Sequence, residues 1–223
     1  MTNRQPFAPR EWYHCYARGV EGRKTFETKG DYERFLQLLY ITNSTEARHR
    51  SDLVAPTLES VVQLPRPQTL VNIGAYCLMQ NHFHLLLQEK SDAGIAKFMQ
   101  KLGIAYAMYF NIRHHRTGNL FVKPFRSRHI ADDRYFQRVL QYIHCNPAEL
   151  YERGWKNGTV KDMSLLQKRL VAYPYSSFAD HTGVQTITRP ILDSSVFEIA
   201  SQLPLEKMLA EVALYYKDFS MSR

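Results

Sequence analysis

Cysteine is scarce in this sequence, and long apolar runs are missing. Only three cysteines occur among 223 residues, and none lies close to another, so neither a disulfide framework nor a CxxC metal site is expected. No apolar run approaches the roughly 18–20 residues that a membrane-spanning helix needs. The N-terminal stretch MTNRQPFAPREWYH has no apolar core of the kind found in signal peptides. We therefore expect a cytoplasmic protein without a membrane partner.

Acidic residues are in the minority. Lys and Arg number 29 against 21 Asp and Glu, which gives a formal net charge of +8. Such an excess favours polyanionic partners, because each neutralised phosphate releases counterions. The 14 tyrosines could also supply rings that stack on unpaired bases. Together these features favour a nucleic-acid partner and a nucleoid-associated protein; a merely basic surface over an aromatic core is the alternative.

Hydrophobic periodicity predicts strands and helices in alternation. We expect strands at 11–18, 69–79 and 82–88, the last two joined by a short turn at Gln80-Asn81. Between the first two strands, Asp31 is expected to cap a helix that carries apolar residues at helical spacing.

The second half of the pattern contains two more helices. A long helix is predicted at 95–114, and a strand follows the basic loop HHRTGNLFVKPFRSRHI. Asp132 or Asp133 should cap the next helix, which stops before Pro147. The order β-α-β-β-α-β is typical of a ferredoxin-like α+β fold, an antiparallel sheet with helices on one face.

Some segments lie outside this pattern. Residues 48–68 are polar and contain three prolines, so we expect a loop or mobile insertion there. Residues 148–183 are expected to be irregular, and helices are expected around 196–202 and 205–216. The predicted division of the chain is a domain at 1–180 and a C-terminal helical extension at 181–223.

The strand expected at 82–88 begins with His82-Phe83-His84. Alternate residues of a strand point to the same face, so the two imidazoles project together and can share a cation. A zinc hydrolase would have a further acid or histidine soon after, and two leucines stand there instead. Two partly exposed histidines on a solvated sheet face are the alternative.

Tyr142 and Asn146 lie near the end of the helix that precedes Pro147. Four residues apart, they share one helical face. A tyrosine can attack a phosphodiester, and the phosphotyrosine keeps the bond energy needed for rejoining. An ordinary phenol has a pKa near 10, so a cation on the phosphate would help, and Asn146 offers an oxygen ligand. Tyr135 shares nearly the same face without such a partner; a packed tyrosine and a helix-end asparagine are the alternative.

Several motifs in order resemble one known family. The segments GAYCLMQNHFHLLL, YAMYFNIRHHRTGNLFVKPFRS, QYIHCNPAEL and YPYSSF are similar to those of the REP-associated tyrosine transposases. These enzymes belong to the single-tyrosine transposases of the HUH superfamily, and the resemblance covers about residues 11–180. Gln80 departs from the family pattern, which commonly has proline there.

The resemblance implies a function and a set of site residues. His82, His84 and Asn146 match the family's metal-binding positions for Mg²⁺ or Mn²⁺, and Tyr142 matches the nucleophile. The implied activity is cleavage and transfer of single-stranded DNA through a 5′-phosphotyrosine, beside hairpins formed by REP-like palindromes. Related enzymes include dimers that share active sites, so a monomer and a homodimer are both open.

Basic residues near this region are the candidates for DNA contact. The predicted DNA-binding residues are Arg18, Arg23, Lys24, Arg113, Arg116, Lys123, Phe125, Arg126 and Arg128. Two other functions remain open: a non-catalytic protein that binds single strands or hairpins, such as a domesticated transposase, and a phosphodiesterase that uses metal-bound water.

Overall fold

A computed structural model describes residues 6–46, 53–66, 68–201 and 203–220 of the chain. Its centre is a four-stranded antiparallel sheet with the strand order β2-β3-β1-β4. The strands are β1 (Trp12–Arg18), β2 (Val71–Met79), β3 (His82–Glu89) and β4 (Arg126–Ile130). The predicted strands and the α+β class are confirmed, and the strand order is that of a ferredoxin-like sheet.

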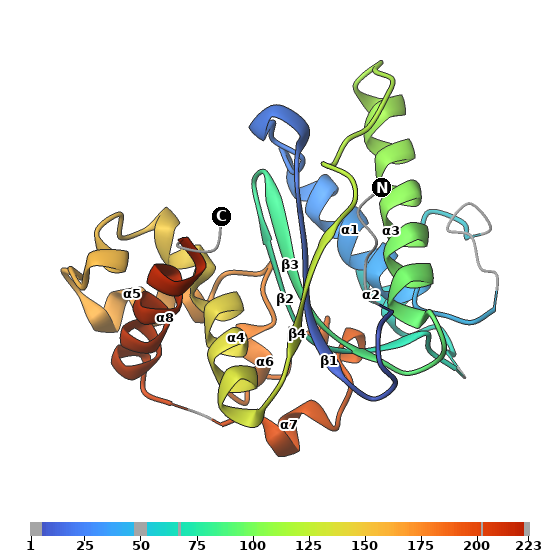
Figure 1. Ribbon diagram of the computed structural model, residues 1–223. Coiled ribbons are helices and arrows are strands. Elements are labelled where there is room, and N and C mark those ends of the chain that lie inside the picture. The colour runs from blue at the N-terminus through green and yellow to red at the C-terminus, as the bar shows by residue number, and fades with distance from the viewer. Residues whose placement is uncertain (1–5, 47–52, 67, 202, 221–223) are drawn as a thin grey trace.

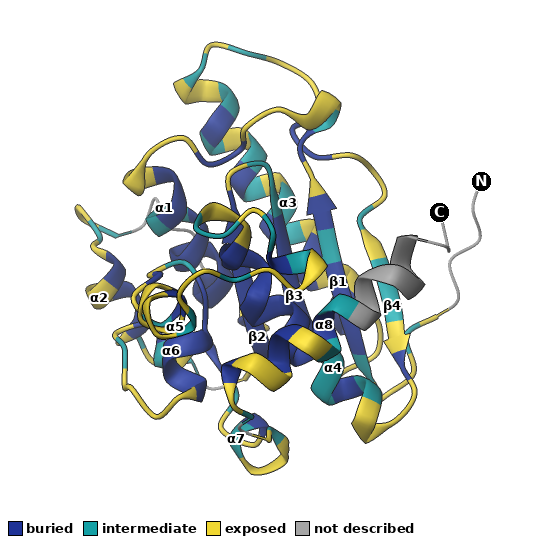
Figure 2. Cartoon of the chain, turned by 90° about the vertical axis from the view of Figure 1, so that its left-hand side faces the viewer, coloured by how far each residue is buried: buried dark blue, intermediate teal, exposed yellow. Residues whose placement is uncertain are grey.

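The register between strands sets which side chains share a face. In the β1–β3 pair, Tyr16 lies opposite His84 and Arg18 lies opposite His82. Directly opposite residues of an antiparallel pair point to the same side, so these four side chains belong to one face of the sheet. Figure 2 shows mostly buried residues along β2 and β3, whereas the edge strand β4 carries intermediate and exposed ones.

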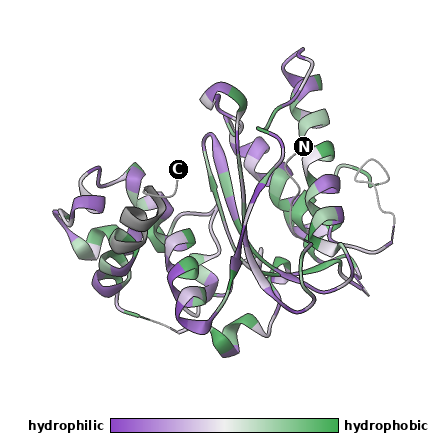
Figure 3. Ribbon diagram, viewed as in Figure 1, coloured by the Kyte–Doolittle hydropathy of each residue, from purple (hydrophilic) through white to green (hydrophobic). Residues whose placement is uncertain are grey.

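Two helices cover the other face. Phe83, Leu85 and Leu87 of β3 pack there in one apolar cluster with Phe35 and Phe98. Figure 1 shows both helices on the same side of the sheet, and Figure 3 shows hydrophobic and hydrophilic residues alternating along them. The helices on this face are α1 (Lys29–Ile41) and α3 (Gly94–Arg113).

The segment predicted as a loop contains a short helix. Within 48–68, residues Leu58–Val62 form α2, which packs against α1. Val61 and Val62 are buried, so the helix persists because it adds to the apolar core. The prediction of a loop was wrong for these residues; residues 48–52 and 67 of the same prediction lie outside the described part of the chain.

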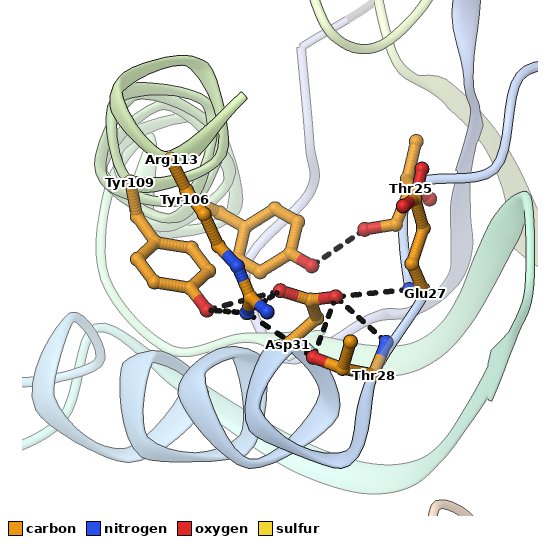
Figure 4. Close-up of polar contacts among 7 residues, drawn as sticks. All are labelled: Thr25, Glu27, Thr28, Asp31, Tyr106, Tyr109 and Arg113. Carbon is orange, nitrogen blue, oxygen red and sulfur yellow. Dashed lines mark hydrogen bonds and ion pairs between the residues drawn. The ribbon is translucent and has the colours of Figure 1, made fainter. Parts of the chain in front are cut away.

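The first helix begins earlier than predicted. Thr28 is the N-cap, and Asp31 forms a capping box with it from inside the first turn. One oxygen of Asp31 accepts hydrogen bonds from the backbone N–H groups of Glu27 at 3.0 Å and Thr28 at 2.8 Å. The other oxygen accepts from Tyr109 and Arg113 on α3, at 2.9 Å each (Figure 4). Asp31 therefore ties α1 to α3.

A third long helix, α4 (Asp133–Cys145), lies on the histidine face of the sheet. Its Val139, Leu140 and Ile143 pack with Leu86 of β3 in a second apolar cluster. The prediction of helices on one face of the sheet was therefore incomplete. Figure 1 shows α4 across the sheet from α1 and α3. The reason is that β2 and β3 are apolar on both sides, and each side has to be covered.

The chain after α4 is more helical than predicted. Met163–Val171 form α5, although the region was expected to be irregular, while the two predicted C-terminal helices are confirmed. The remaining helices are η1 (Val20–Gly22), η3 (Asn146–Leu150), η4 (Trp155–Asn157), α6 (Phe178–His181), η5 (Arg189–Ile191), α7 (Val196–Ile199) and α8 (Leu205–Ser220). Leu205 and Val212 of α8 join the α4 cluster, so the C-terminal segment packs on the tyrosine helix. A domain boundary at 180 stays a prediction. None of the described helices is long and apolar enough to cross a membrane.

Candidate active site

The two histidines of the H-x-H motif begin β3 and face α4. Their ring centroids lie 5.0 Å apart. Burial lowers the pKa of His82 to about 4, against a hydrogen bond with Asn146 that raises it. Burial also lowers the pKa of His84 well below its usual value, and the neighbouring His82 and His14 act in the same direction. Both imidazoles are therefore neutral near pH 7, as a metal ligand must be.

Tyr142 comes to the same place from α4. Its ring lies 5.2 Å from the ring of His84 in an edge-to-face arrangement, and only 5% of the residue is exposed. The start of α4 is fixed by Asp132, whose side chain accepts a hydrogen bond from the N–H of Tyr135 at 2.7 Å. The predicted cap of this helix is confirmed. The fold places the ring of Tyr142 against that of His84, as the predicted pairing with the histidines requires.

Asn146 follows α4 directly, as the first residue of η3. Its Nδ2 donates a 2.7 Å hydrogen bond to the carbonyl oxygen of Tyr142, one turn back. Its side chain is also hydrogen-bonded to His82. The α-helical hydrogen bonding ends here because Pro147 has no N–H to donate, although Asn146 itself keeps αR backbone angles and the chain continues as η3. Asn146 thus joins the tyrosine helix to the histidine strand.

A third histidine, which sequence analysis did not select, lies beside these residues. His14 of β1 is fully buried, and its Nε2 lies 2.9 Å from Nδ1 of His84. The ring of Tyr142 lies 5.5 Å from it. Burial lowers the pKa of His14 to about 3, and the positive charge of Arg128 adds to the effect. His14 stands two residues before Tyr16, so strand alternation puts both side chains on one face. Only the register between β1 and β3, in which Tyr16 lies opposite His84, shows that this is the face of the H-x-H histidines.

The donor atoms on this face fit a divalent cation. Nε2 of His84 is buried and has no hydrogen-bond partner among the described residues. Nδ1 of His82 lies 2.8 Å from Oδ1 of Asn81, which can only accept, so Nδ1 carries the proton and Nε2 keeps its lone pair. Within the described ranges, no three His, Cys, Asp or Glu side chains converge as a metal site. Two imidazoles completed by the amide of Asn146 are consistent with that finding.

Tyr135 lies in a different environment from Tyr142. It is in the first turn of α4, and its hydroxyl accepts a hydrogen bond of 3.4 Å from Nη1 of Arg128. The ring of Tyr142 contacts the rings of His14 and His84. Tyr142 therefore lies against the histidines of the sheet, whereas the hydroxyl of Tyr135 is bound to Arg128.

Three of the predicted DNA-binding residues share the histidine face. Arg126 lies opposite Tyr16, and Arg128 lies opposite His14, in the β1–β4 register. Arg18 lies opposite His82 and lowers the pKa of that histidine through its charge. These arginines place positive charge beside the histidines.

The other predicted DNA-binding residues lie elsewhere. Arg113 donates to the buried carboxylate of Asp31, and Arg116 donates to Oδ1 of Asn111 at 2.6 Å. The half-buried ring of Phe125 packs beside Phe7 on the α1–α3 side. The remaining three are exposed in loops: Arg23, Lys24 and Lys123.

The chain matches the family model described as "Transposase IS200 like" over residues 35–146, half of its length. No curated protein matches it in sequence. Among solved structures it is similar to a REP-associated tyrosine transposase bound to a REP hairpin, with 13% sequence identity and a TM-score of 0.48. That alignment covers 91% of this chain and 98% of the other. The segment matched by the family model contains both histidines of the motif, Tyr142 and Asn146.

Proposed function

This chain belongs to the family of IS200-like transposases, and from that premise we propose that it cuts and rejoins single-stranded DNA through Tyr142. The observation that carries the proposal is the 5.2 Å contact between the rings of Tyr142 and His84. These residues are 58 positions apart in sequence (142 minus 84) and come from separate elements, α4 and β3. Packing alone brings them to one face.

In the proposed site, His82, His84 and Asn146 hold one divalent ion, Mg²⁺ or Mn²⁺. Support comes from two neutral imidazoles, from Nε2 of His84, which is unpartnered among the described residues, and from the amide of Asn146, which is hydrogen-bonded to His82. When bound, such an ion would polarise the scissile phosphate. The amide also satisfies a carbonyl oxygen at the end of α4, because Asn146 donates to the carbonyl of Tyr142.

Tyr142 supplies the nucleophile in this proposal. Its phenol oxygen forms a bond to phosphorus while the bond from phosphorus to O3′ breaks. The phenolic proton passes to solvent, and the departing O3′ takes up a proton and becomes a 3′-hydroxyl. The product is a 5′-phosphotyrosine, in agreement with the family resemblance. Attack by the 3′-hydroxyl of another strand on the same phosphorus frees Tyr142 and joins the strands, so no nucleotide cofactor is consumed.

The proposed substrate is single-stranded DNA beside a hairpin formed by REP-like palindromes. Arg18, Arg126 and Arg128 are the proposed phosphate contacts nearest the site, because the strand register puts them on the histidine face. Arg23, Lys24 and Lys123 are proposed to contact flanking DNA from their exposed loops. The four residues of the proposed centre lie together within one chain, so a monomer is the proposed unit of cleavage and a homodimer is the alternative.

The test uses labelled single-stranded hairpins from the genomic neighbourhood of the gene, incubated with the protein and Mn²⁺. Wild-type protein is expected to give an SDS-resistant protein–DNA species. Tyr142→Phe should bind the same hairpin and give no such species. Tyr135→Phe is the matched control, because it removes a hydroxyl from the same helix two turns away and should keep adduct formation.

Two other results would replace the proposal. If the wild-type protein binds hairpins but forms no protein–DNA adduct in the presence of Mg²⁺ or Mn²⁺, a non-catalytic binding protein is the better assignment. If Tyr142→Phe still cleaves, water is the nucleophile and the protein is a phosphodiesterase.

A further inference from the structure

His14 lies directly behind one of the proposed metal ligands. Its side chain is fully buried in β1, and its Nε2 lies 2.9 Å from Nδ1 of His84 on the adjacent strand. The two rings are stacked with centroids 5.1 Å apart. Nε2 of His14 is thus directed at a ring nitrogen of His84, and among the described residues no three His, Cys, Asp or Glu side chains form a group that could hold a metal ion. His14 contacts the side of the His84 ring that faces away from the free nitrogen.

A hydrogen bond between two neutral imidazoles has two arrangements. In the first, Nδ1–H of His84 donates to Nε2 of His14, and Nε2 of His84 keeps its lone pair. In the second, Nε2–H of His14 donates to Nδ1 of His84, and Nε2 of His84 carries a proton instead. Only the first arrangement allows a cation to bind at Nε2, which is the atom without a partner among the described residues.

His82, the neighbouring proposed ligand, is held in the same way by the side chain of Asn81. Nδ1 of His82 lies 2.8 Å from the carboxamide oxygen of Asn81, and an amide oxygen can only accept. The proton of His82 is therefore on Nδ1. Both histidines of the motif thus have a partner at Nδ1; Nε2 of His84 has no partner among the described residues, whereas His82 has a second hydrogen bond, with Asn146. Metal-binding histidines in general hold their second ring nitrogen by such a hydrogen bond.

We infer that His14 is a positioning residue for the metal centre, which accepts the Nδ1 proton of His84 and so directs the Nε2 lone pair of His84 toward the cation. This inference rests on the proposed function, because it concerns the same cation site. His14 fixes the ring orientation as well, since the stacked contact and the hydrogen bond come from the same strand neighbour.

A packing role alone accounts poorly for this residue. Nδ1 of His14 is buried without a hydrogen-bond partner among the described residues, which is costly for a polar atom. An apolar ring of similar size would fill the same space without that cost. Among the described residues, the hydrogen bond to His84 is the only one that the His14 side chain makes, so it is the feature that distinguishes histidine from phenylalanine here.

The inference is tested by titrating the DNA-free protein with Mn²⁺ and measuring the dissociation constant by electron paramagnetic resonance. His14→Phe keeps a ring and removes the acceptor, and we expect it to weaken Mn²⁺ binding by about 10- to 100-fold. His14→Gln restores an acceptor oxygen and should recover part of the loss. The second readout is nitrogen NMR of the imidazoles in wild-type protein loaded with diamagnetic Zn²⁺, where the proton of His84 is expected on Nδ1.

The outcomes separate this inference from the proposed function. If wild type does not bind Mn²⁺, or if His84→Ala binds it equally well, the cation site itself is wrong. If His84→Ala loses binding while His14→Phe matches wild type, the site stands and the role of His14 is refuted. Equal weakening by His14→Phe and His14→Gln would also refute it, because the acceptor would then not matter. A proton on Nε2 of His84 in the Zn²⁺-loaded protein would refute it without any variant.

Discussion

Replacing Asp31 by asparagine should destabilise the protein strongly, although Asp31 lies outside the proposed active site. Five donors surround this buried carboxylate: the N–H groups of Glu27 and Thr28, the Thr28 hydroxyl, Tyr109 and Arg113. In Asp31→Asn an NH₂ group replaces one carboxylate oxygen. This group cannot accept hydrogen bonds from the donors that face it, and the negative charge is lost. Hydrogen bonds to a charged group contribute about 1.5–3 kcal/mol each, and some donors can turn to new partners. We expect a loss of about 2–4 kcal/mol in the free energy of unfolding.

Urea denaturation at pH 7 measures this loss, with Glu33→Gln as the matched control. Glu33 is on the same helix and pairs with Lys29 at the surface, at 3.4 Å, so its replacement should cost less than about 0.5 kcal/mol. If the two variants have equal unfolding free energies, the reasoning about Asp31 is refuted. Arg113→Met should cost about 1 kcal/mol or less, because the arginine side chain is 41% exposed and its charge is partly screened.

The pH dependence supplies a second check on Asp31. Burial alone would raise the pKa of this carboxyl, but hydrogen bonds from Thr28, Glu27 and Tyr109 outweigh burial and hold the pKa below its usual value near 4. A lowered pKa in the folded state means that the stabilisation is fully present above the unfolded pKa and is lost as the pH falls through the folded one. The difference between wild type and Asp31→Asn should therefore be constant near neutrality and shrink below about pH 4. A difference that stays the same in acid would contradict the assignment.

Two further predictions concern DNA binding and packing. In a binding titration with DNA, Arg126→Met should lower the slope of log affinity against log salt concentration by about 0.7–0.9. Arg113→Met should leave the slope unchanged, because Arg113 already binds Asp31. Equal slopes for both variants would show that the histidine face does not bind phosphate. Gly74→Ala should cost about 1–3 kcal/mol in thermal or urea unfolding, because the added Cβ would lie 2.8 Å from the Trp12 ring and 3.1 Å from Leu86. The control is Gly103→Ala inside α3, where the added Cβ has no atom within 4 Å, so the variant should stabilise the protein by about 0.5–1 kcal/mol. If this control destabilises the protein, the clash with Trp12 and Leu86 does not explain the effect of Gly74→Ala.

Much of the local structure was predictable because it is encoded locally. Alternation located β1, a short polar turn between two apolar segments located β2 and β3, and the cap at Asp132 located α4, since these signals lie within a few residues of the element they define. Local spacing also put His82 and His84 on one side of a strand and Tyr142 one turn from Asn146. The start of α1 was misjudged because Asp31 completes a capping box from inside the helix. The short helix α2 and the helix α5 were missed, since their stability depends on burial against distant segments.

The sequence by itself determined which residues are the candidates for chemistry and which side of each element they occupy. Only the tertiary structure decided that α4 crosses to the face of the sheet where the histidines lie, and so brings a tyrosine against His84. It also decided that Arg113 is bound to Asp31 and that His14, 70 residues away in the chain, lies behind His84. The physical reason is that periodicity specifies an apolar side but not its partner. The partner is chosen by strand register and by the need to cover both faces of the sheet, which depend on the whole chain at once.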